Sequence, residues 1–363
     1  MNSSCSNKEE LIAGIRTKTM TLEEKVGQLF IISPEDLDKD YNLDNKAYYS
    51  LTNKAKETYA KYPCGGFILF DTNIDNPEQL KNLTSELRSL SGDVPFIAID
   101  EEGGMVARIA NNPGFDVKKF GNMSYIGQTG NADNAYDVGY TIGSYLKEYG
   151  ITVDFAPVGD INTNPNNIVI GERAFGSDPY AVNWMIQSVI FGLHDTGTLS
   201  CVKHYPGHGD TSSDTHTQMA YTNKTWDELL NYELVPFIAG IEANTDFIMV
   251  GHIAAENVTG DELPSSLSRV MITEKLRNEL NYDGLIITDS LEMGAITNNY
   301  DPLTASVMAI NAGVDIVLLP GDYIEVYQGV LDAVKNGIIS EERIDESVNR
   351  ILKVKEKLIE KDY

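Results

Sequence analysis

The stretch GLIITDS, residues 284–290, is a short apolar run that ends in polar residues. A nearly continuous apolar run of this length is typical of a strand that is buried on both faces of a parallel sheet. Seven further runs of the same kind occur along the chain: GQLFIIS (27–33), GGFILF (65–70), PFIAID (95–100), VDFAPV (153–158), SCVKHY (200–205), FIMVGHI (247–253) and DIVLLP (315–320). The sequence therefore predicts eight buried strands.

Segments with apolar residues at helical spacing lie between these runs. One begins at Thr21, with Glu24 in the position of a capping box. Three others are followed by a glycine suited to a helix C-cap: Gly150, Gly197 and Gly313. Eight β–α alternations predict an α/β protein with a single (β/α)8 TIM barrel over residues 12–363, after a disordered N-terminal linker over residues 1–11.

The alternative fold is an open doubly wound sheet, which usually carries a glycine-rich phosphate loop after an early strand. The nearest candidate is DEEGGM (100–105), and it has neither the GxGxxG nor the Walker spacing. The barrel is the better interpretation.

Composition narrows the classes of partner. The 363 residues carry a formal charge of −26, which argues against nucleic acid and against anionic lipid as partners. No apolar run approaches the roughly 18 residues of a membrane-spanning segment. Oligomeric state is not encoded in any pattern that we recognise.

The three cysteines, Cys5, Cys64 and Cys201, do not suggest a disulfide framework. The start MNSSCSNKEE is not a signal peptide, because it has no apolar segment. A cysteine followed by a polar linker resembles the mature end of a bacterial lipoprotein. Location therefore stays open between the bacterial cytoplasm and a secreted or cell-surface lipoprotein that is anchored at Cys5 and has lost its signal.

Polar residues recur where the predicted strands end or shortly after them: Asp100, Glu101, Glu102, Arg108, Arg173, Lys203, His204, His252 and Asp289. Because barrel active sites lie at the carboxyl ends of the strands, we expect these side chains to meet on one rim.

Several of these residues also have a purely structural interpretation. Arg173 could pair with Glu172 or Asp178 at a surface turn. His204 could be a packed histidine that is bonded to a backbone carbonyl. Asp289 could cap the next helix, since aspartate is a favoured N-cap. Their coincidence on one predicted face favours function.

The loop KHYPGHGDTSSDTH, residues 203–216, allows two kinds of chemistry. A metal site could draw on His204, His208 and His216, with Asp210 or Asp214. Alternatively, Asp214 and His216 form a dyad in which the carboxylate orients the imidazole for proton transfer. Paired with Asp289, such a dyad suits a retaining glycoside hydrolase. Glycines at 207 and 209 would let the loop swing, leaving His216 away from Asp289 without substrate.

The same loop resembles the signature of glycoside hydrolase family 3 β-N-acetylglucosaminidases of the NagZ type, with Tyr205 where that family usually has phenylalanine. Three further blocks are similar to the family's and stand in the same order: IAIDEEGGMVARI (97–109), NTNPNNIVIGERAFGSDP (162–179) and GLIITDSLEMGAI (284–296). The resemblance extends from about residue 20 to 358.

This resemblance implies roles for individual residues. Asp289 would be the nucleophile, His216 the general acid/base and Asp214 its orienting partner. The terminal GlcNAc would be held by Asp100, Arg108, Arg173, Lys203 and His204. His208 and Asp210 would support the loop, and neither cofactor nor metal would be needed.

The resemblance also implies an activity: exo-hydrolysis of terminal β-linked GlcNAc, with muropeptides from peptidoglycan turnover as the typical substrates. The chain ends soon after the eighth strand, so the C-terminal α/β sandwich domain of related glucosidases is not expected. Transfer to phosphate instead of water stays open. The competing hypotheses are a sugar-binding barrel without turnover and a metal hydrolase built on the three histidines.

Overall fold

The computed structural model describes residues 2–41, 47–211 and 214–360. Eight parallel strands form the expected barrel: β1 (Phe30–Ile32), β2 (Gly66–Leu69), β3 (Phe96–Ile99), β6 (Val153–Asp154), β7 (Leu199–Tyr205), β9 (Phe247–Val250), β11 (Leu285–Thr288) and β12 (Val317–Leu318). They pair in the order β11-β9-β7-β6-β3-β2-β1-β12, and a parallel bridge between Ile287 and Ile316 closes the ring. The single TIM barrel is thus confirmed, and the open doubly wound sheet is not adopted.

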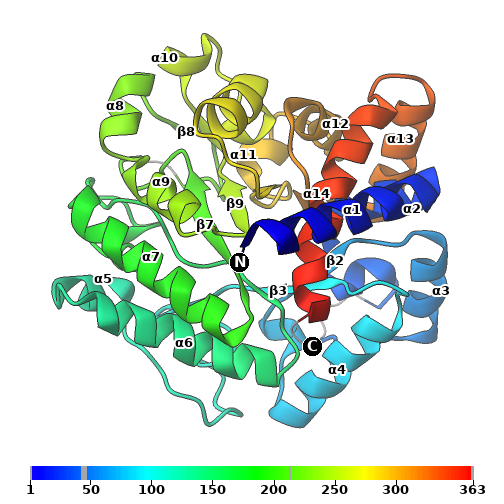
Figure 1. Ribbon diagram of the computed structural model, residues 1–363, viewed down its shortest axis with the longest axis horizontal. Helices are drawn as coiled ribbons and strands as arrows, with labels where there is room; N and C mark the ends of the chain where they lie inside the picture. The colour runs from blue at the N-terminus through cyan, green and yellow to red at the C-terminus, as the bar shows by residue number, and fades with distance from the viewer. Residues whose placement is uncertain (1, 42–46, 212–213, 361–363) are drawn as a thin grey trace.

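Helices surround the strands (Figure 1). Those from the first half of the chain are α1 (Asn2–Thr19), α2 (Leu22–Gln28), α3 (Asn53–Lys61), α4 (Pro77–Ser89), α5 (Met123–Gln128), α6 (Ala132–Glu148) and α7 (Pro179–Thr196). Those from the second half are α8 (Trp226–Asn231), α9 (Val235–Glu242), α10 (Glu256–Thr259), the π-helix η6 (Val270–Glu279), α11 (Gly294–Thr297), α12 (Pro302–Ala312), α13 (Tyr323–Lys335) and α14 (Glu341–Glu360).

Local signals account for several helix ends. Thr21 and Glu24 form the expected capping box at the start of α2. Helices α7 and α12 end at Gly197 and Gly313, both with left-handed backbone angles that glycine adopts without strain. These signals place helix boundaries, and the buried apolar strands place the core inside the ring.

The first helix differs from the expectation of a disordered linker over residues 1–11, because α1 is helical from Asn2 onward. It packs beside α14, as Figure 1 shows, through polar contacts: Arg16 donates to Glu356 at 2.8 Å and Thr17 to Asn349 at 2.8 Å. Ala13 of the same helix is buried in the hydrophobic core. The side chain of Cys5 lies outside the described part of the chain, whereas Cys64 and Cys201 are buried and free.

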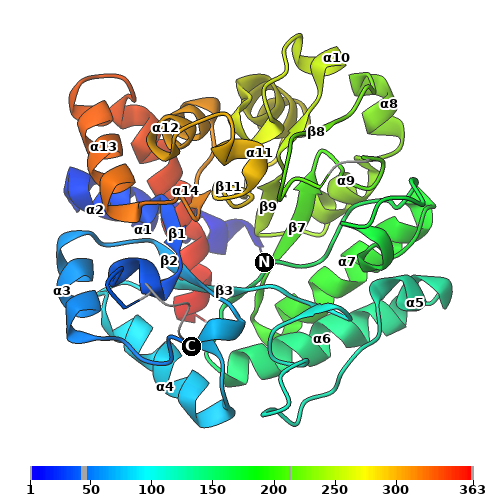
Figure 2. The same cartoon turned by 180° about the vertical axis from the view of Figure 1, so that it is seen from behind.

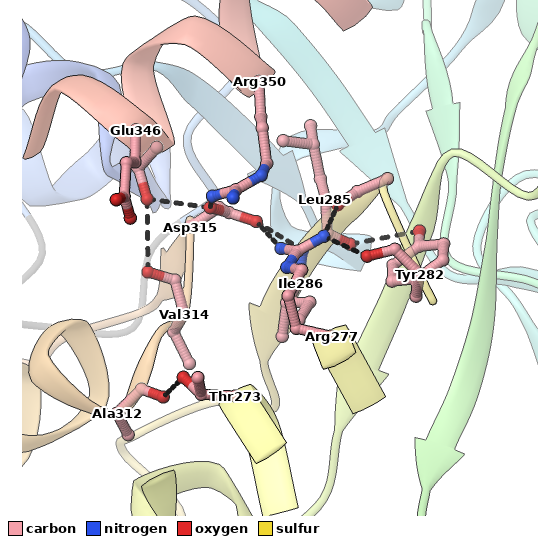
Figure 3. Close-up of polar contacts among 12 residues, drawn as sticks. Thr273, Arg277, Tyr282, Leu285, Ile286, Ala312, Val314, Asp315, Glu346 and Arg350 are labelled. Atoms are coloured by element: carbon pink, nitrogen blue, oxygen red, sulfur yellow. Dashed lines mark hydrogen bonds and ion pairs between the residues drawn. The ribbon is translucent and has the colours of Figure 1, made fainter. Parts of the chain in front are cut away.

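A buried aspartate links two strands at the amino end of the barrel. Asp315, just before β12, accepts the N–H of Ile286 at 3.0 Å and so links the last two strands of the ring. Three arginines also donate to it: Arg277 at 2.6 Å, Arg350 at 3.1 Å and Arg343 at 3.5 Å. Figure 3 shows Arg277 and Arg350 reaching Asp315 from η6 and α14. Burial would raise the pKa of Asp315, but the arginines hold it below its ordinary value.

Among the described helices, none is both long enough and apolar enough to cross a membrane. Figure 2 shows the molecule from the side opposite to that of Figure 1. The loops that follow the carboxyl ends of the strands lie on this face.

Candidate active site

A cavity of about 330 Å³ opens at the carboxyl ends of the strands. Its lining includes nearly all the side chains that the sequence analysis selected: Asp100, Arg108, Arg173, Lys203, His204, His216 and Asp289. Asp214 and His252 are not part of the lining; Asp214 contacts His216, which is. Because the carboxyl ends of all barrel strands lie at one end of the barrel, residues almost 190 positions apart meet in this cavity.

Glu102 organises one wall of this cavity. It is almost fully buried and forms a two-point contact with Arg173, from Nε at 2.9 Å and Nη2 at 2.6 Å. Lys203 lies 2.7 Å from the same carboxylate and donates to Asp100 at 2.6 Å. Arg173 is thus paired with Glu102 rather than with Glu172 or Asp178.

Electrostatics in this wall follow from the pairing. Burial alone would raise the pKa of Glu102 and lower those of Lys203 and Arg173. The opposite charges outweigh burial, so the pKa of Glu102 is held well below its ordinary value and both cations are raised above theirs. All three groups stay charged around neutral pH.

Glu101, between Asp100 and Glu102 in the sequence, bonds to backbone N–H groups and not to the cations of the wall. Its carboxylate accepts the N–H groups of Arg108 at 2.6 Å, Ile109 at 2.9 Å and Ala110 at 2.8 Å, and the Tyr145 hydroxyl at 2.8 Å. It therefore fixes the turn that carries Arg108 to the cavity. The guanidinium of Arg108 lies 3.9 Å from Asp100.

A second buried acid orients the histidines of β7 and the following loop. Asp160 is 2.7 Å from Nδ1 of His204, so the packed histidine is bonded to a carboxylate and not to a carbonyl. Asp160 also accepts the backbone N–H of His208 at 2.5 Å. The ring of His208 contacts the hydroxyls of Thr211 at 2.6 Å and Thr215 at 3.2 Å. Burial lowers the pKa of His208, which suits the supporting role expected of it.

Asp289 follows β11 and is partly buried in the cavity. Its N–H donates to the carbonyl of Val250 at 2.9 Å, and its Oδ1 accepts the N–H of Ser290 at 2.8 Å. It does not cap a helix, because α11 begins only at Gly294. Burial raises its pKa, but His204, His252, the Ser290 N–H and Lys203 together bring it below the ordinary value. The group is therefore a carboxylate at neutral pH.

His252 supports the segment that follows Asp289. Its Nε2 lies 2.8 Å from the Ser290 carbonyl and its Nδ1 2.8 Å from the Ser266 hydroxyl. Burial lowers the pKa of this histidine, which favours the neutral ring. Since a carbonyl only accepts, the proton belongs on Nε2, and Nδ1 accepts from Ser266.

The expected contact between Asp214 and His216 is present, with Oδ1 2.7 Å from Nδ1. The same oxygen accepts the His216 N–H at 2.9 Å. Burial would raise the pKa of Asp214, but these hydrogen bonds lower it. The imidazole is 67% exposed at the mouth of the cavity, so its other nitrogen is accessible.

The loop that carries the dyad is docked on the first turn of α11. Gly294 donates to the His216 carbonyl at 3.0 Å and Ala295 to the Thr215 carbonyl at 3.1 Å. Gly209 packs so closely on the Ile161 carbonyl that a Cβ would lie 1.9 Å from it. These contacts hold the main chain of His216 beside the cavity, and a swing of the loop on substrate binding stays a prediction.

Asp210 also supports the loop. It accepts from Thr163 at 3.0 Å and lies 3.2 Å from the ammonium of Lys224. Within residues 2–41, 47–211 and 214–360, no group of three or more His, Cys, Asp or Glu side chains is arranged to hold a metal ion.

The sequence analysis placed Glu102 on the rim without giving it a role, and it passed over Asp160. Glu102 stands two positions after Asp100, which places both side chains on the same side of an extended segment, and this alternation could have indicated a shared role. Asp160 carried no such signal, because its partner histidines come from another strand and loop.

Comparison with known proteins gives a consistent family. Residues 21–354 match the glycosyl hydrolase family 3 N-terminal domain. "Beta-hexosaminidase A" of Pseudoalteromonas piscicida is 36% identical over 340 residues, which cover 86% of this chain and 56% of that protein. A "Beta-hexosaminidase" of Hydrogenovibrio crunogenus is 35% identical over 266 residues, covering 71% of this chain and 72% of the relative.

Among solved structures, a glycoside hydrolase family 3 β-N-acetylglucosaminidase from Paenibacillus sp. str. FPU-7 is similar, with a TM-score of 0.86 and 36% identity. The match covers 93% of this chain and 63% of that one. The chain thus spans a little over half of the Pseudoalteromonas relative and less than two thirds of the Paenibacillus protein. Together with the family match along most of its length, these similarities show that the chain belongs to glycosyl hydrolase family 3.

Proposed function

We propose that this chain is a retaining exo-β-N-acetylglucosaminidase that releases terminal, non-reducing β-linked GlcNAc through a covalent glycosyl-aspartate. The observation that carries the proposal is the pairing, in one cavity, of the ionised Asp289 with the His216–Asp214 dyad. The name of the Paenibacillus protein supports GlcNAc as the sugar, and the name of the Pseudoalteromonas protein supports a hexosamine more generally.

In the first step the Asp289 carboxylate attacks the anomeric carbon, and the bond from that carbon to the aglycone oxygen breaks. His216 gives the proton on its Nε2 to the departing oxygen, while Asp214 accepts the hydrogen bond from Nδ1. In the second step His216 takes a proton from water, whose oxygen displaces Asp289 and restores the enzyme. Two displacements at one carbon retain its β configuration.

The charged wall would hold the sugar. Asp100, Arg108, Arg173, Lys203 and His204 present donors and acceptors on strand ends and on the turns that follow them, where their positions are fixed by buried acids. Charged partners form strong, directional hydrogen bonds with hydroxyl and acetamido groups. Resemblance to the NagZ type supports muropeptides from peptidoglycan turnover as the natural source of the GlcNAc.

The first experiment is release of p-nitrophenol from its β-GlcNAc and β-glucoside conjugates, with and without EDTA, by wild type and Asp289→Ala. We expect strong preference for the GlcNAc conjugate, no effect of EDTA, and loss of at least about a thousandfold in Asp289→Ala. Proton NMR of early product should show the β anomer.

Three outcomes would overturn the proposal. Near-normal turnover by Asp289→Ala would remove the nucleophile. GlcNAc binding in a calorimeter without turnover would indicate a sugar-binding barrel. Inactivation by EDTA, with zinc near one equivalent, would indicate a metal hydrolase. Repeating the assay in phosphate and looking for GlcNAc 1-phosphate separates hydrolysis from transfer to phosphate.

A further inference from the structure

A second cavity, of about 250 Å³, opens at the amino end of the barrel. Its walls are the segments that precede β9 and β11, the end of α9 and one face of α14. Among the described residues, none lines both this cavity and the candidate active site, whose cavity measures about 330 Å³. The second cavity thus has room for a small molecule at the opposite end of the barrel, and we call it the basal cavity.

Helix α14 presents three cations to the basal cavity: Arg350, Lys353 and Lys357. Their spacing of three and four positions places them on one face of the helix. Their side chains are 24%, 31% and 35% exposed, so each reaches the cavity from a partly buried position. Cations arranged in this way can contact one shared ligand.

The two acids in the lining already contact protein groups. Asp246 is buried, with Lys357 at 2.7 Å and the ring of His194 at 2.8 Å. Asp283 is 80% exposed and lies 3.5 Å from Lys353, which makes a weak pair. Because an ammonium group has three N–H donors, Lys353 has donor capacity beyond this single contact.

A charge imbalance lies directly behind Arg350. Its partner Asp315 is shared with Arg277 and Arg343, so one buried carboxylate contacts three guanidinium groups (Figure 3). Burial lowers the pKa of Arg277, Asp315 raises it and Arg350 lowers it again, and the balance lies below the ordinary value. The only further carboxylate that the described residues pair with this cluster is the surface acid Glu346, on Arg343.

The sum of these charges is positive. With the Lys357–Asp246 pair set apart, four cations of the cavity and the cluster behind it face three carboxylates among the described residues. The cations are Lys353, Arg277, Arg343 and Arg350, and the carboxylates are Asp283, Asp315 and Glu346. The chain as a whole carries a formal charge of −26, so the basal cavity is a local reversal of sign.

A phosphate group has the chemistry that this cavity lacks. A phosphate monoester carries about two negative charges at neutral pH and three strong acceptor oxygens. Guanidinium and ammonium groups are its usual partners, because they offer charge-assisted donors and no acceptor. Asn244 and Asn281 also line the cavity, and their carboxamides can donate to the same oxygens or to hydroxyl groups.

We propose that the basal cavity binds a small molecule that bears a phosphate group, with the phosphate contacted by Arg350 and Lys353. The ligand is either the free anion or the phosphate ester of a small polyol or sugar, which present the same recognised group. Because the cavity lies at the opposite end of the barrel from Asp289, this ligand is neither substrate nor product of the proposed reaction. It binds the folded chain and so stabilises it by mass action.

The test is calorimetric titration of the full chain with inorganic phosphate, glycerol 3-phosphate and glycerol. The buffer is Tris chloride at constant ionic strength, because salt screens partly exposed charges. We expect both phosphates to bind and glycerol not to bind. Lys353→Gln should raise the Kd of the phosphates about five- to tenfold, because one charge-assisted partner is lost, and Lys353→Glu should raise it more.

The matched control is Lys335→Gln. Lys335, at the end of α13, is 51% exposed and, like Lys353, lies 3.5 Å from a carboxylate, that of Glu23. It changes the net charge by the same amount away from the basal cavity, so its Kd values should equal those of wild type. None of these substitutions touches the buried Asp315 cluster, and the release of GlcNAc should be the same in all of them.

Tighter binding of glycerol 3-phosphate than of phosphate would support an ester as the ligand, and equal Kd values would support the free anion. Wild-type protein that binds neither phosphate would overturn the inference. Equal Kd values in wild type, Lys353→Gln and Lys353→Glu would place the anion elsewhere, for example in the catalytic cavity, and would also overturn it. An equal loss in Lys335→Gln and Lys353→Gln would show a general effect of charge and would refute a site.

Discussion

Two buried ion clusters occupy opposite ends of the same barrel. At the carboxyl end, Asp100 and Glu102 pair with Arg173 and Lys203 beside a cavity. At the amino end, a single aspartate, Asp315, holds three arginines. Both clusters consist of charges that would be costly to bury without partners. They differ in what else the charged groups contact.

At the amino end Asp315 is fully buried and other protein groups bond to it and to Arg277, while Arg350 lines the basal cavity, of about 250 Å³. Arg277 also donates to the carbonyls of Tyr282 and Gly284, at 2.6 and 2.7 Å, and Ser347 donates to Asp315 at 2.8 Å. At the carboxyl end the same kinds of side chain line open space. A buried ion pair, even with a cavity beside it, therefore does not mark a catalytic site by itself; the candidate active site also gathers Asp289 and His216.

The comparison predicts that loss of the Asp315 charge damages stability and spares activity. Asp315→Asn leaves three arginines around a neutral group, and breaking a buried pair typically costs about 3–5 kcal/mol. We expect a loss of that size in the free energy of unfolding, measured with urea, and an unchanged KM for the folded fraction.

The control at the same end is Asp283→Asn. The Asp283 side chain is 80% exposed and 3.5 Å from Lys353, so its loss should cost less than about 1 kcal/mol. If fully folded Asp315→Asn protein lost activity, the assignment of stability to the amino end and activity to the carboxyl end would be wrong.

Glu102→Gln should show the converse pattern. It removes the charge that fixes Arg173 and Lys203, both of which are expected to hold the sugar before and during the reaction. We expect kcat/KM for GlcNAc substrates to fall about 10- to 100-fold, mostly through KM, because binding common to ground and transition states is lost.

Glu102 would act as a positioning residue, so a purely structural role must be distinguished. Calorimetric affinity for free GlcNAc should fall with the rise in KM, while the pH dependence of kcat should keep its shape. A stability loss as large as that of Asp315→Asn with normal KM would show that the two clusters are equivalent.

The fold was accessible from sequence because its signals are local. Eight apolar runs mark the strands, and residues such as Thr21, Gly197 and Gly313 mark helix ends. The barrel then placed Lys203 and Asp289 on one rim without any knowledge of their contacts. Geometry shared by all such barrels supplied that step.

What sequence did not supply was the choice of partners. Arg173 had acidic neighbours in the chain, yet it pairs with Glu102, 71 positions earlier. Asp315 is not part of any sequence motif. Its role depends on its ion pairs with arginines of η6 and α14, which are distant in the sequence. The helical start of the chain was missed for the same reason: Arg16 and Thr17 of α1 bond to partners in α14, more than 300 positions away.

Asp36 differs from the paired acids of both clusters, because it is buried beside other carboxylates. Asp36, after β1, is raised in pKa to about 8, first by burial and then by Glu292 across the rim. Burial also raises the pKa of Glu292, with Glu35 adding to it. The opposing effects of Lys39 and of the Ser33 N–H, which donates to Asp36 at 2.9 Å, do not offset this.

Because the pKa of Asp36 is higher in the folded than in the unfolded chain, folding is favoured at low pH. This contribution is complete below the ordinary aspartate pKa, 3.8, and is lost as pH rises toward about 8. Asp36→Asn keeps an oxygen for the Ser33 N–H and carries no charge. We expect it to match wild type in thermal midpoint near pH 4 and to exceed it at pH 9. For the acids with lowered pKa, such as Asp315, the dependence is reversed, and their contribution is lost as pH falls. An Asp36→Asn midpoint that is shifted equally at both pH values would mean that the carboxyl does not titrate in this range, and the contrast with the paired acids would fail.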